Sequence, residues 1–164
     1  MDLTKTLVIG NSGSGKSWLS ERIANHLKAT WVDLDLIHWL PDPERYNAGR
    51  RREDAIRLAR EAANGSRWVI EGIYGWLIRE IQSDATALIW IDLSETERTG
   101  NIRQRGIRRN GTDKSFAALL RWAETYRTRD DSGSYTAHAR IFHEFTGIKK
   151  HRGSRDEIAS FLAA

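Results

Sequence analysis

Residues 10–17 read Gly-Asn-Ser-Gly-Ser-Gly-Lys-Ser, and this segment constrains the fold more than any other part of the chain. It directly follows an apolar stretch, residues 7–9, that is typical of a β-strand. It leads into residues 17–27, whose apolar side chains recur at the spacing of a helix. A strand that passes through a glycine-rich loop into a helix is a characteristic unit of α/β proteins.

The rest of the sequence continues this alternation of strands and helices. Further strands are predicted at residues 31–34, 68–70, 88–93 and 148–151. Helices are predicted at residues 50–63, 135–145, from a Ser94 cap through Arg105, and from a Ser115 cap through Arg127. A last helix is expected after the capping box at residues 154–157. We therefore expect a single α/β domain over residues 1–164, with a parallel sheet and helices on both faces.

Composition excludes several classes of protein. The longest apolar stretches, residues 6–9 and 87–91, are far shorter than the roughly 20 residues of a membrane span. The 164 residues include no cysteine, so neither disulfides nor a thiolate metal site can form. The first residues lack the layout of a signal peptide, and we expect a cytoplasmic protein without membrane contacts.

The charge of the chain indicates an anionic partner without choosing one. The net charge is +4, and 20 of the 26 basic residues are arginine. Guanidinium groups bind phosphate oxygens bidentately and stay charged. The partner is therefore a small phosphorylated ligand or, as a less favoured alternative, a nucleic acid. The oligomeric state stays open.

The glycine-rich loop matches the pattern G-x-x-x-x-G-K-[ST] at every fixed position. Glycines let successive backbone N–H groups turn inward toward phosphate oxygens, and the following helix N-terminus adds partial positive charge. Lys16 would neutralise the terminal phosphates, and the Ser17 hydroxyl would ligate Mg²⁺. A chance glycine-rich turn is the alternative, but the strand–loop–helix context favours nucleotide binding. The expected phosphate contacts are Gly10, Asn11, Ser12, Gly13, Ser14, Gly15, Lys16 and Ser17.

The type of phosphate-loop (P-loop) protein is narrowed by what the sequence lacks. It contains neither the Asn-Lys-x-Asp that reads guanine in GTPases nor the Leu-Ser-Gly-Gly of ABC-type ATPases. AAA+ modules and helicases are usually longer. A chain of this length best suits a kinase whose bound substrate receives the γ-phosphoryl group.

Carboxylates end two of the predicted strands. Asp33 and Asp35 stand at positions i and i+2 of the second strand, which would place them on the same side. Glu71 ends the third strand, and Asp92 after the fourth strand is a rival acid. Because ligands of parallel sheets bind at the carboxyl ends of the strands, these acids can orient Mg²⁺-bound water or accept a proton. Which of Asp33, Asp35 and Glu71 is the base and which binds the metal-bound water is open. For the two aspartates, the alternative is a solvated strand end without a catalytic role.

An arginine-rich segment indicates a mobile lid over residues 105–115. Five arginines precede the flexible Asn110-Gly111-Thr112, namely Arg98, Arg103, Arg105, Arg108 and Arg109. Such a lid can close over ATP and stabilise charge on the moving phosphoryl group, a role expected above all for Arg105 and Arg109. A solvated helix or an RNA-facing surface is the alternative. Arg127 and Arg129 are further candidates for phosphate contacts.

Taken together, these segments resemble the adenylate kinase and shikimate kinase group of small P-loop kinases. They resemble more closely a related bacterial family, the topology modulation proteins. Besides the loop, the resemblance rests on Leu34-Asp35-Leu36-Ile37-His38-Trp39, on Trp68-Val69-Ile70-Glu71-Gly72-Ile73-Tyr74 and on residues 151–157. Glu71 and Ile73 stand where that family has Asp and Asn, so this chain departs from it on the acceptor side.

The resemblance implies a three-layer P-loop fold with a five-stranded parallel sheet in the order 2-3-1-4-5, and it implies use of ATP and Mg²⁺. It implies an acceptor pocket near Asp35, an adenine stacked on Arg103 or Arg105, and a base edge against Gly153 and Ser154. The residues expected on the acceptor side are Asp33, Asp35, Trp39, Glu71 and Tyr74, and the metal would contact Ser17, Asp33 and Glu71.

The aromatic residues divide into core and pocket candidates. Trp68 and Trp90 lie in predicted strands and are expected in the core. Trp18 and Trp76 are expected to have a packing role. Trp39 follows Asp35 and can wall a pocket by stacking on a ring, with loop packing as an equal alternative. His38 is expected to pack or lie on the surface.

The sequence thus predicts an ATP-dependent kinase that phosphorylates a small molecule on a hydroxyl or phosphate group. Lys16, Asp35, Arg105 and Arg109 are the expected catalytic residues. A nucleoside monophosphate kinase is the first alternative. A nucleotide-switched or RNA-associated ATPase without a small-molecule acceptor is the second.

Overall fold

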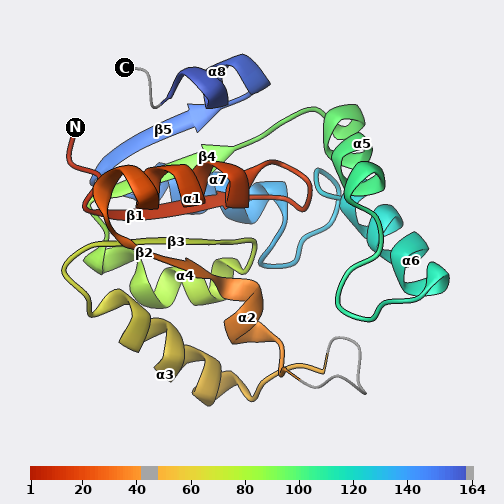
Figure 1. Cartoon of the computed structure of the whole chain (residues 1–164), viewed down its shortest axis with the longest axis horizontal. Helices are drawn as coiled ribbons and strands as arrows, with labels where there is room; N and C mark the ends of the chain where they lie inside the picture. Colours follow the sequence, from red (N-terminus) through yellow and green to blue (C-terminus); the bar gives the residue numbers. More distant parts are fainter. Residues whose placement is uncertain (42–47, 162–164) are drawn as a thin grey trace.

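The computed structural model describes residues 1–41 and 48–161. Its centre is a parallel sheet of five strands, in the order β2-β3-β1-β4-β5 (Figure 1). The strands are β1 (Lys5–Gly10), β2 (Thr30–Asp33), β3 (Trp68–Gly72), β4 (Ala87–Ile91) and β5 (Ile148–Arg152). The predicted fold class and strand order are confirmed.

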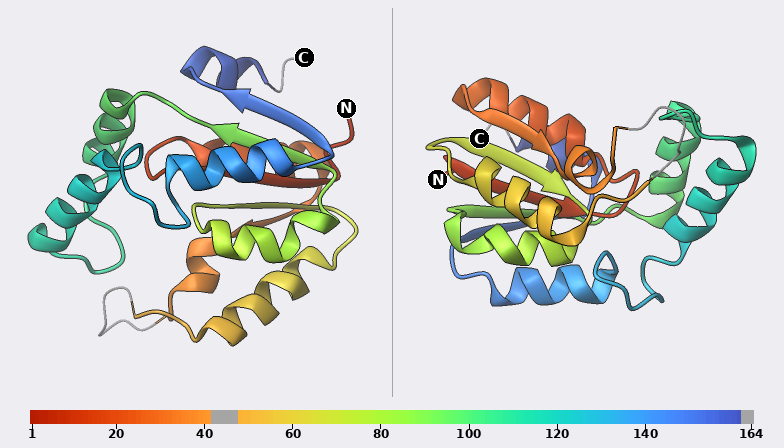
Figure 2. Two further views of the ribbon diagram at one scale, coloured as in Figure 1. Left: turned by 180° about the vertical axis from the view of Figure 1, so that it is seen from behind. Right: turned by 90° about the horizontal axis from the view of Figure 1, so that it is seen from below.

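Helices cover both faces of this sheet (Figures 1 and 2). One face packs on α1 (Lys16–Leu27) and α8 (Arg155–Ser160). The other packs on α2 (Leu34–His38), α3 (Arg52–Ala63), α4 (Gly75–Ile81) and α7 (Tyr135–Glu144). A short 3₁₀ turn, η1 (Gln82–Asp84), follows α4. Two helices, α5 (Glu95–Arg105) and α6 (Asp113–Glu124), extend beyond the carboxyl ends of the strands (Figure 1).

Alternation along the strands builds two separate cores. In β1, Leu7 and Ile9 face the core shared with α3, α4 and α7, whereas Val8 faces the core shared with α1. Successive side chains of a strand point to opposite faces, and both faces are covered, so the central strands are apolar throughout. Trp68 and Trp90 are buried among them, as predicted.

Several local predictions were wrong. Leu34 begins α2 instead of ending β2, and neither α2 nor α4 was predicted. Helix α6 is capped by Thr112, whose hydroxyl accepts from the backbone N–H of Ser115, so Ser115 is the fourth residue of a capping box and not the cap. Trp18 is 44% exposed on α1, so a packing role is wrong for it.

The register of the sheet gathers the strand ends at one edge. Ile9 pairs with Gly72, and Asp33 pairs with Glu71 on the neighbouring strand. The segments that follow β1, β2 and β3 therefore leave the sheet side by side. In residues 1–41 and 48–161, no helix is long and apolar enough to cross a membrane.

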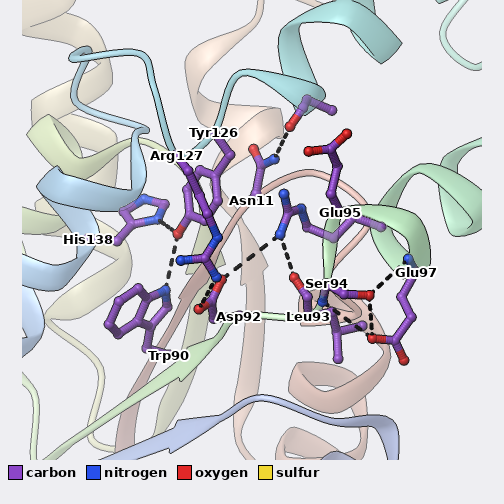
Figure 3. A network of polar contacts seen from close by, with 12 residues as sticks. Asn11, Trp90, Asp92, Leu93, Ser94, Glu95, Glu97, Tyr126, Arg127 and His138 are labelled. Carbon is purple, nitrogen blue, oxygen red and sulfur yellow. Dashed lines mark hydrogen bonds and ion pairs between the residues drawn. The ribbon is translucent and has the colours of Figure 1, made fainter.

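The buried His138 joins this framework through a chain of hydrogen bonds (Figure 3). Its Nε2–H donates to the backbone oxygen of Ile73 at 2.9 Å, so its Nδ1 accepts from the hydroxyl of Tyr126 at 2.8 Å. Trp90 Nε1 donates to the same hydroxyl oxygen at 3.1 Å. Burial lowers the pKa of His138 from 6.5 to about 4.

This shift predicts an acid-sensitive fold. The unfolded chain binds a proton at His138 below its ordinary pKa of 6.5 and the folded chain only below about 4, so stability falls as the pH drops between these values. The full loss is roughly 3 kcal/mol, at 1.36 kcal/mol per pKa unit. Urea unfolding at a series of pH values should show this slope in the wild type and a flatter one in His138→Gln. The exposed His26→Gln serves as the control, and parallel slopes for wild type and His138→Gln would refute the assignment.

Candidate active site

The glycine-rich loop is shaped by backbone that other residues rarely adopt. Gly13 has a φ of +76° and Gly15 a φ of +91°. A side chain at Gly13 would also collide with the backbone oxygen of Arg98 on α5. Gly15 caps α1 without a side-chain hydrogen bond to its first turn. The positive end of α1 therefore opens beside the loop.

Two side chains of the loop region turn toward the end of the sheet. Lys16 Nζ donates to the backbone oxygen of Asn11 at 3.0 Å. The Ser17 hydroxyl donates to Glu71 Oε1 at 2.5 Å. Burial raises the pKa of Glu71 to about 7, although the positive charge of Lys16 opposes the shift. The phosphate loop, Lys16 and Glu71 at the end of β3 therefore lie next to one another.

The two aspartates come together by a different route from the one predicted. Asp33 ends β2 and caps α2, and its Oδ1 accepts from the backbone N–H of Asp35 at 2.8 Å. Asp35 is the second residue of α2. The prediction that both lie on one side of a strand was wrong, because the strand ends at Asp33. The helical turn nevertheless brings Asp35 beside Asp33. Burial and the neighbouring Asp35 charge raise the pKa of Asp33.

Asp35 is held from both sides. One carboxylate oxygen accepts from the Tyr74 hydroxyl at 2.6 Å, and the other from Arg109 Nη2 at 2.7 Å. Burial alone would raise the pKa of Asp35, but the Tyr74 hydrogen bond and the positive charges of Arg109 and Lys16 outweigh it and lower the pKa. Asp35 is therefore an ionised carboxylate near neutral pH.

Arginines at the end of α5 and in the segment after it contact this group. Arg105 Nη2 donates to the Ser12 hydroxyl at 3.0 Å, and Arg109 reaches Asp35. Arg103 is exposed and does not line the cavity. Arg98 does not belong to a lid, since it is buried, bonds the backbone oxygen of Leu93 and lies 3.9 Å from Asp92. The remaining lid roles stay predictions.

Asp92 and Arg127 belong to a supporting network (Figure 3), and Arg129 also bonds the phosphate loop. Arg127 pairs with Asp92 at 2.8 Å, and Arg129 donates to Asn11 Oδ1 at 3.0 Å. The side-chain amide of Asn11 donates to the backbone oxygen of Ala123 at 2.9 Å. Asp92 is thus engaged by cations away from the cavity, whereas Arg129 and Asn11 connect the phosphate loop to the end of α6.

The loop, the acids and the lid arginines enclose one cavity of about 590 Å³. This volume is in the range of small-molecule sites. Of the predicted residues, it is lined by Ser12, Lys16, Ser17, Asp33, Asp35, Trp39, Glu71, Tyr74, Arg105, Arg108 and Arg109. Sequence reasoning placed His38 on the surface or in packing, and it missed Phe116, Leu119 and Trp122, which also line the cavity. The amphipathic pattern of α6 was the sequence signal that could have identified Phe116, Leu119 and Trp122.

Gly153 and Ser154 lie outside this cavity. Ser154 caps α8, and the neighbouring Arg155 donates to Asn101 Oδ1 at 2.6 Å. Asn101 in turn donates to the backbone oxygen of Gly13 at 2.8 Å. The turn is thus connected to the phosphate loop, and its contact with a nucleotide base stays a prediction.

Comparison with known proteins gives a consistent result for the fold. No protein-family model and no curated protein matches the sequence. Solved structures do match. A gluconokinase from Sinorhizobium meliloti 1021 has a TM-score of 0.60 at 17% identity, with 98% of this chain and 88% of that chain covered. A shikimate kinase from Acinetobacter baumannii, in complex with shikimate, has a TM-score of 0.60 at 13% identity and coverages of 96% and 90%.

A third match is the YorR protein from Bacillus subtilis in complex with phosphorylated GDP. It has a TM-score of 0.55 at 12% identity, with 96% of this chain and 92% of that chain covered. The chain has the fold of the small P-loop kinases. Identities this low show the fold alone, and they do not bear on the closer resemblance to the topology modulation proteins.

Proposed function

We propose that this protein is an ATP-dependent phosphotransferase that moves the γ-phosphoryl group of ATP to a small-molecule hydroxyl. The observation that carries the proposal is that Lys16 of the phosphate loop and the ionised Asp35 line the same cavity. A protein that only binds or hydrolyses a nucleotide has no need of Asp35, a carboxylate held by Tyr74 and Arg109, in addition to Glu71 beside the loop. A kinase needs it to receive the proton of the attacking hydroxyl.

Each group has a role in this proposal. The backbone N–H groups of the loop and Lys16 bind the terminal phosphates. Arg105 and Arg109 stabilise the negative charge that spreads over the transferring group. Asp35 orients the acceptor hydroxyl and accepts its proton, and for this the acceptor displaces Arg109 from the carboxylate oxygen that Arg109 bonds.

The residues present also suit Mg²⁺. Within the described ranges, no three His, Cys, Asp or Glu side chains gather as a self-sufficient metal site. Mg²⁺ at phosphate sites keeps several waters and takes only one or two protein ligands, so the Ser17 hydroxyl with Glu71 and Asp33 nearby is a suitable donor set. When bound, the ion would neutralise phosphate charge.

The closer resemblance remains part of the proposal. The Leu34–Trp39 and Trp68–Tyr74 segments that support membership of the topology modulation family are the two that carry Asp35 and Tyr74 into the cavity. That family name specifies no acceptor.

A metabolite-pool screen tests the proposed activity. The protein is incubated with Mg²⁺, ATP and a fractionated small-molecule extract, and ADP release is followed by mass analysis of phosphorylated products. We expect one fraction to accelerate ADP release and to yield a phosphate ester. Slow ATP consumption that no fraction accelerates would refute the proposal and favour an ATPase.

The contact between Tyr74 and Asp35 predicts a pH effect. In Tyr74→Phe the hydroxyl that stabilises the carboxylate is lost, so the pKa of Asp35 rises. Because the reaction needs the ionised form, the acid limb of the kcat/KM profile should move to higher pH. Tyr135→Phe, outside the cavity, should leave the limb in place. An unmoved limb in Tyr74→Phe would exclude Asp35 as the titrating group.

A nucleoside monophosphate kinase is the second candidate. Arg108 and Arg109 both line the cavity, and arginines are the groups that a phosphate-bearing acceptor requires. Conversion of a monophosphate to a diphosphate in the same assay would favour this candidate.

A further inference from the structure

An aromatic cluster borders Asp35 in the cavity. The His38 ring stacks on Tyr74, with ring centroids 4.1 Å apart and an angle of 21° between the planes. Trp39 packs edge-on against His38, at 4.2 Å between centroids. All three rings line the cavity, and the Tyr74 hydroxyl touches Asp35 itself. A wall of rings therefore begins where the acceptor hydroxyl must lie.

The facing wall is also apolar. Helix α6 turns Phe116, Leu119 and Trp122 toward the cavity, and all three are only half-buried. Ala123 is the one described residue of α6 that is fully buried. An amphipathic helix normally packs its apolar side on a core. In α6, apolar side chains line the cavity instead. A flat apolar ligand could be held between the two walls.

The charges around Asp35 disfavour an anionic group next to the reacting hydroxyl. Lys16 and Arg105 bond to the phosphate loop, and Arg109 is paired with Asp35. Arg108 also lines the cavity, in the segment after α5. A carboxylate or phosphate on the acceptor would approach Asp35, with Asp33 and Glu71 close behind it. Like charges in such a site repel each other strongly.

We propose that the acceptor is an uncharged alcohol with a planar unsaturated ring, which binds between the ring cluster and α6. The inference rests on the proposed kinase function and narrows its substrate class. A nucleoside and a simple aromatic alcohol share this chemistry. The hydroxyl oxygen forms a bond to the γ-phosphorus, the bond from that phosphorus to the β-phosphate oxygen breaks, and ADP leaves with the electron pair. The hydroxyl proton passes to the Asp35 carboxylate.

The test identifies the acceptor directly. Wild-type protein with Mg²⁺ and ATP is given a nucleoside mixture, 4-hydroxybenzyl alcohol, gluconate, glycerol or AMP in separate arms, and the complete metabolite extract in a sixth. Phosphorylation of a nucleoside or of the aromatic alcohol, or of a ring-bearing neutral alcohol from the extract, supports the inference and separates the two sources. A product formed only from an acid, a polyol or AMP overturns it while the kinase function stands. No phosphorylated product in any arm overturns the kinase function itself.

A tryptophan variant tests the ring contact independently. Stacking on an aromatic side chain contributes enough that its removal should raise the KM for the recovered acceptor at least about tenfold in Trp39→Ala. Trp39→Phe should restore most of this loss, and the KM for ATP should stay unchanged in both. Trp18→Ala, on the exposed face of α1, is the matched control. An acceptor KM in Trp39→Ala equal to that of the control would overturn ring recognition, and ATP binding by calorimetry verifies that each variant is folded.

Discussion

Lys16→Ala is expected to lower phosphoryl transfer by at least about 10²–10³-fold, the loss seen when one charge-stabilising donor is removed from an active site. Lys16 is only 8% exposed and lines the cavity, and its ammonium donates to the loop carbonyl of Asn11 at 3.0 Å. Water cannot replace a buried positive charge at the phosphates. Single-turnover transfer from ATP to the recovered acceptor measures the loss.

The control for this variant is Lys149→Ala. Lys149 is exposed on the edge strand β5 and does not line the cavity. Its ammonium donates to the backbone oxygen of His143 and lies over the Phe142 ring, so its removal should leave the rate unchanged. Full activity in Lys16→Ala would show that the phosphate loop does not hold the transferring group.

Asp35→Asn should lower kcat by about 10²–10⁴-fold, the usual contribution of a positioned general base, with little change in ATP affinity. Asparagine keeps one oxygen that can accept from Tyr74, whereas its NH2 group cannot accept from Arg109, so the variant loses the proton acceptor together with this ion pair. Steady-state kinetics with calorimetry of ATP binding separates the two effects.

Asp84→Asn is the matched control, because Asp84 is exposed in η1, which precedes the amino end of β4, and does not line the cavity. If Asp35→Asn weakens nucleotide binding while kcat is retained, Asp35 belongs to the metal site and Asp33 or Glu71 becomes the candidate base.

The fold was predictable because its signals are local. Apolar strands such as residues 7–9 and 87–91, helical spacing, and the glycines of the loop each report on a few neighbouring residues. The strand order came from resemblance, since alternation alone does not determine which strands are neighbours. Helix α2 escaped prediction because it is only five residues long and starts from a side-chain cap at Asp33.

The phosphate side of the site was predictable for the same reason, and the acceptor side was not. Lys16 and Ser17 sit within one motif, whereas the pairing of Asp35 with Arg109 joins residues 74 positions apart. Arg98 illustrates the limit, because it shares a segment with the lid arginines and yet turns inward to Leu93. Only the packing of α5 on the loop distinguishes it from Arg105. The placement of Phe116 and Trp122 in the cavity likewise depends on how α6 crosses the end of the sheet.

The most direct test of the central claim is isothermal calorimetry of the folded wild-type protein with Mg²⁺ and ATP, with Lys16→Ala alongside. We expect saturable, one-site heat with the wild type and a strongly weakened signal with the variant. An absence of heat from the wild type with any purine triphosphate would contradict a phosphate-binding loop at residues 10–17, and with it the proposed kinase.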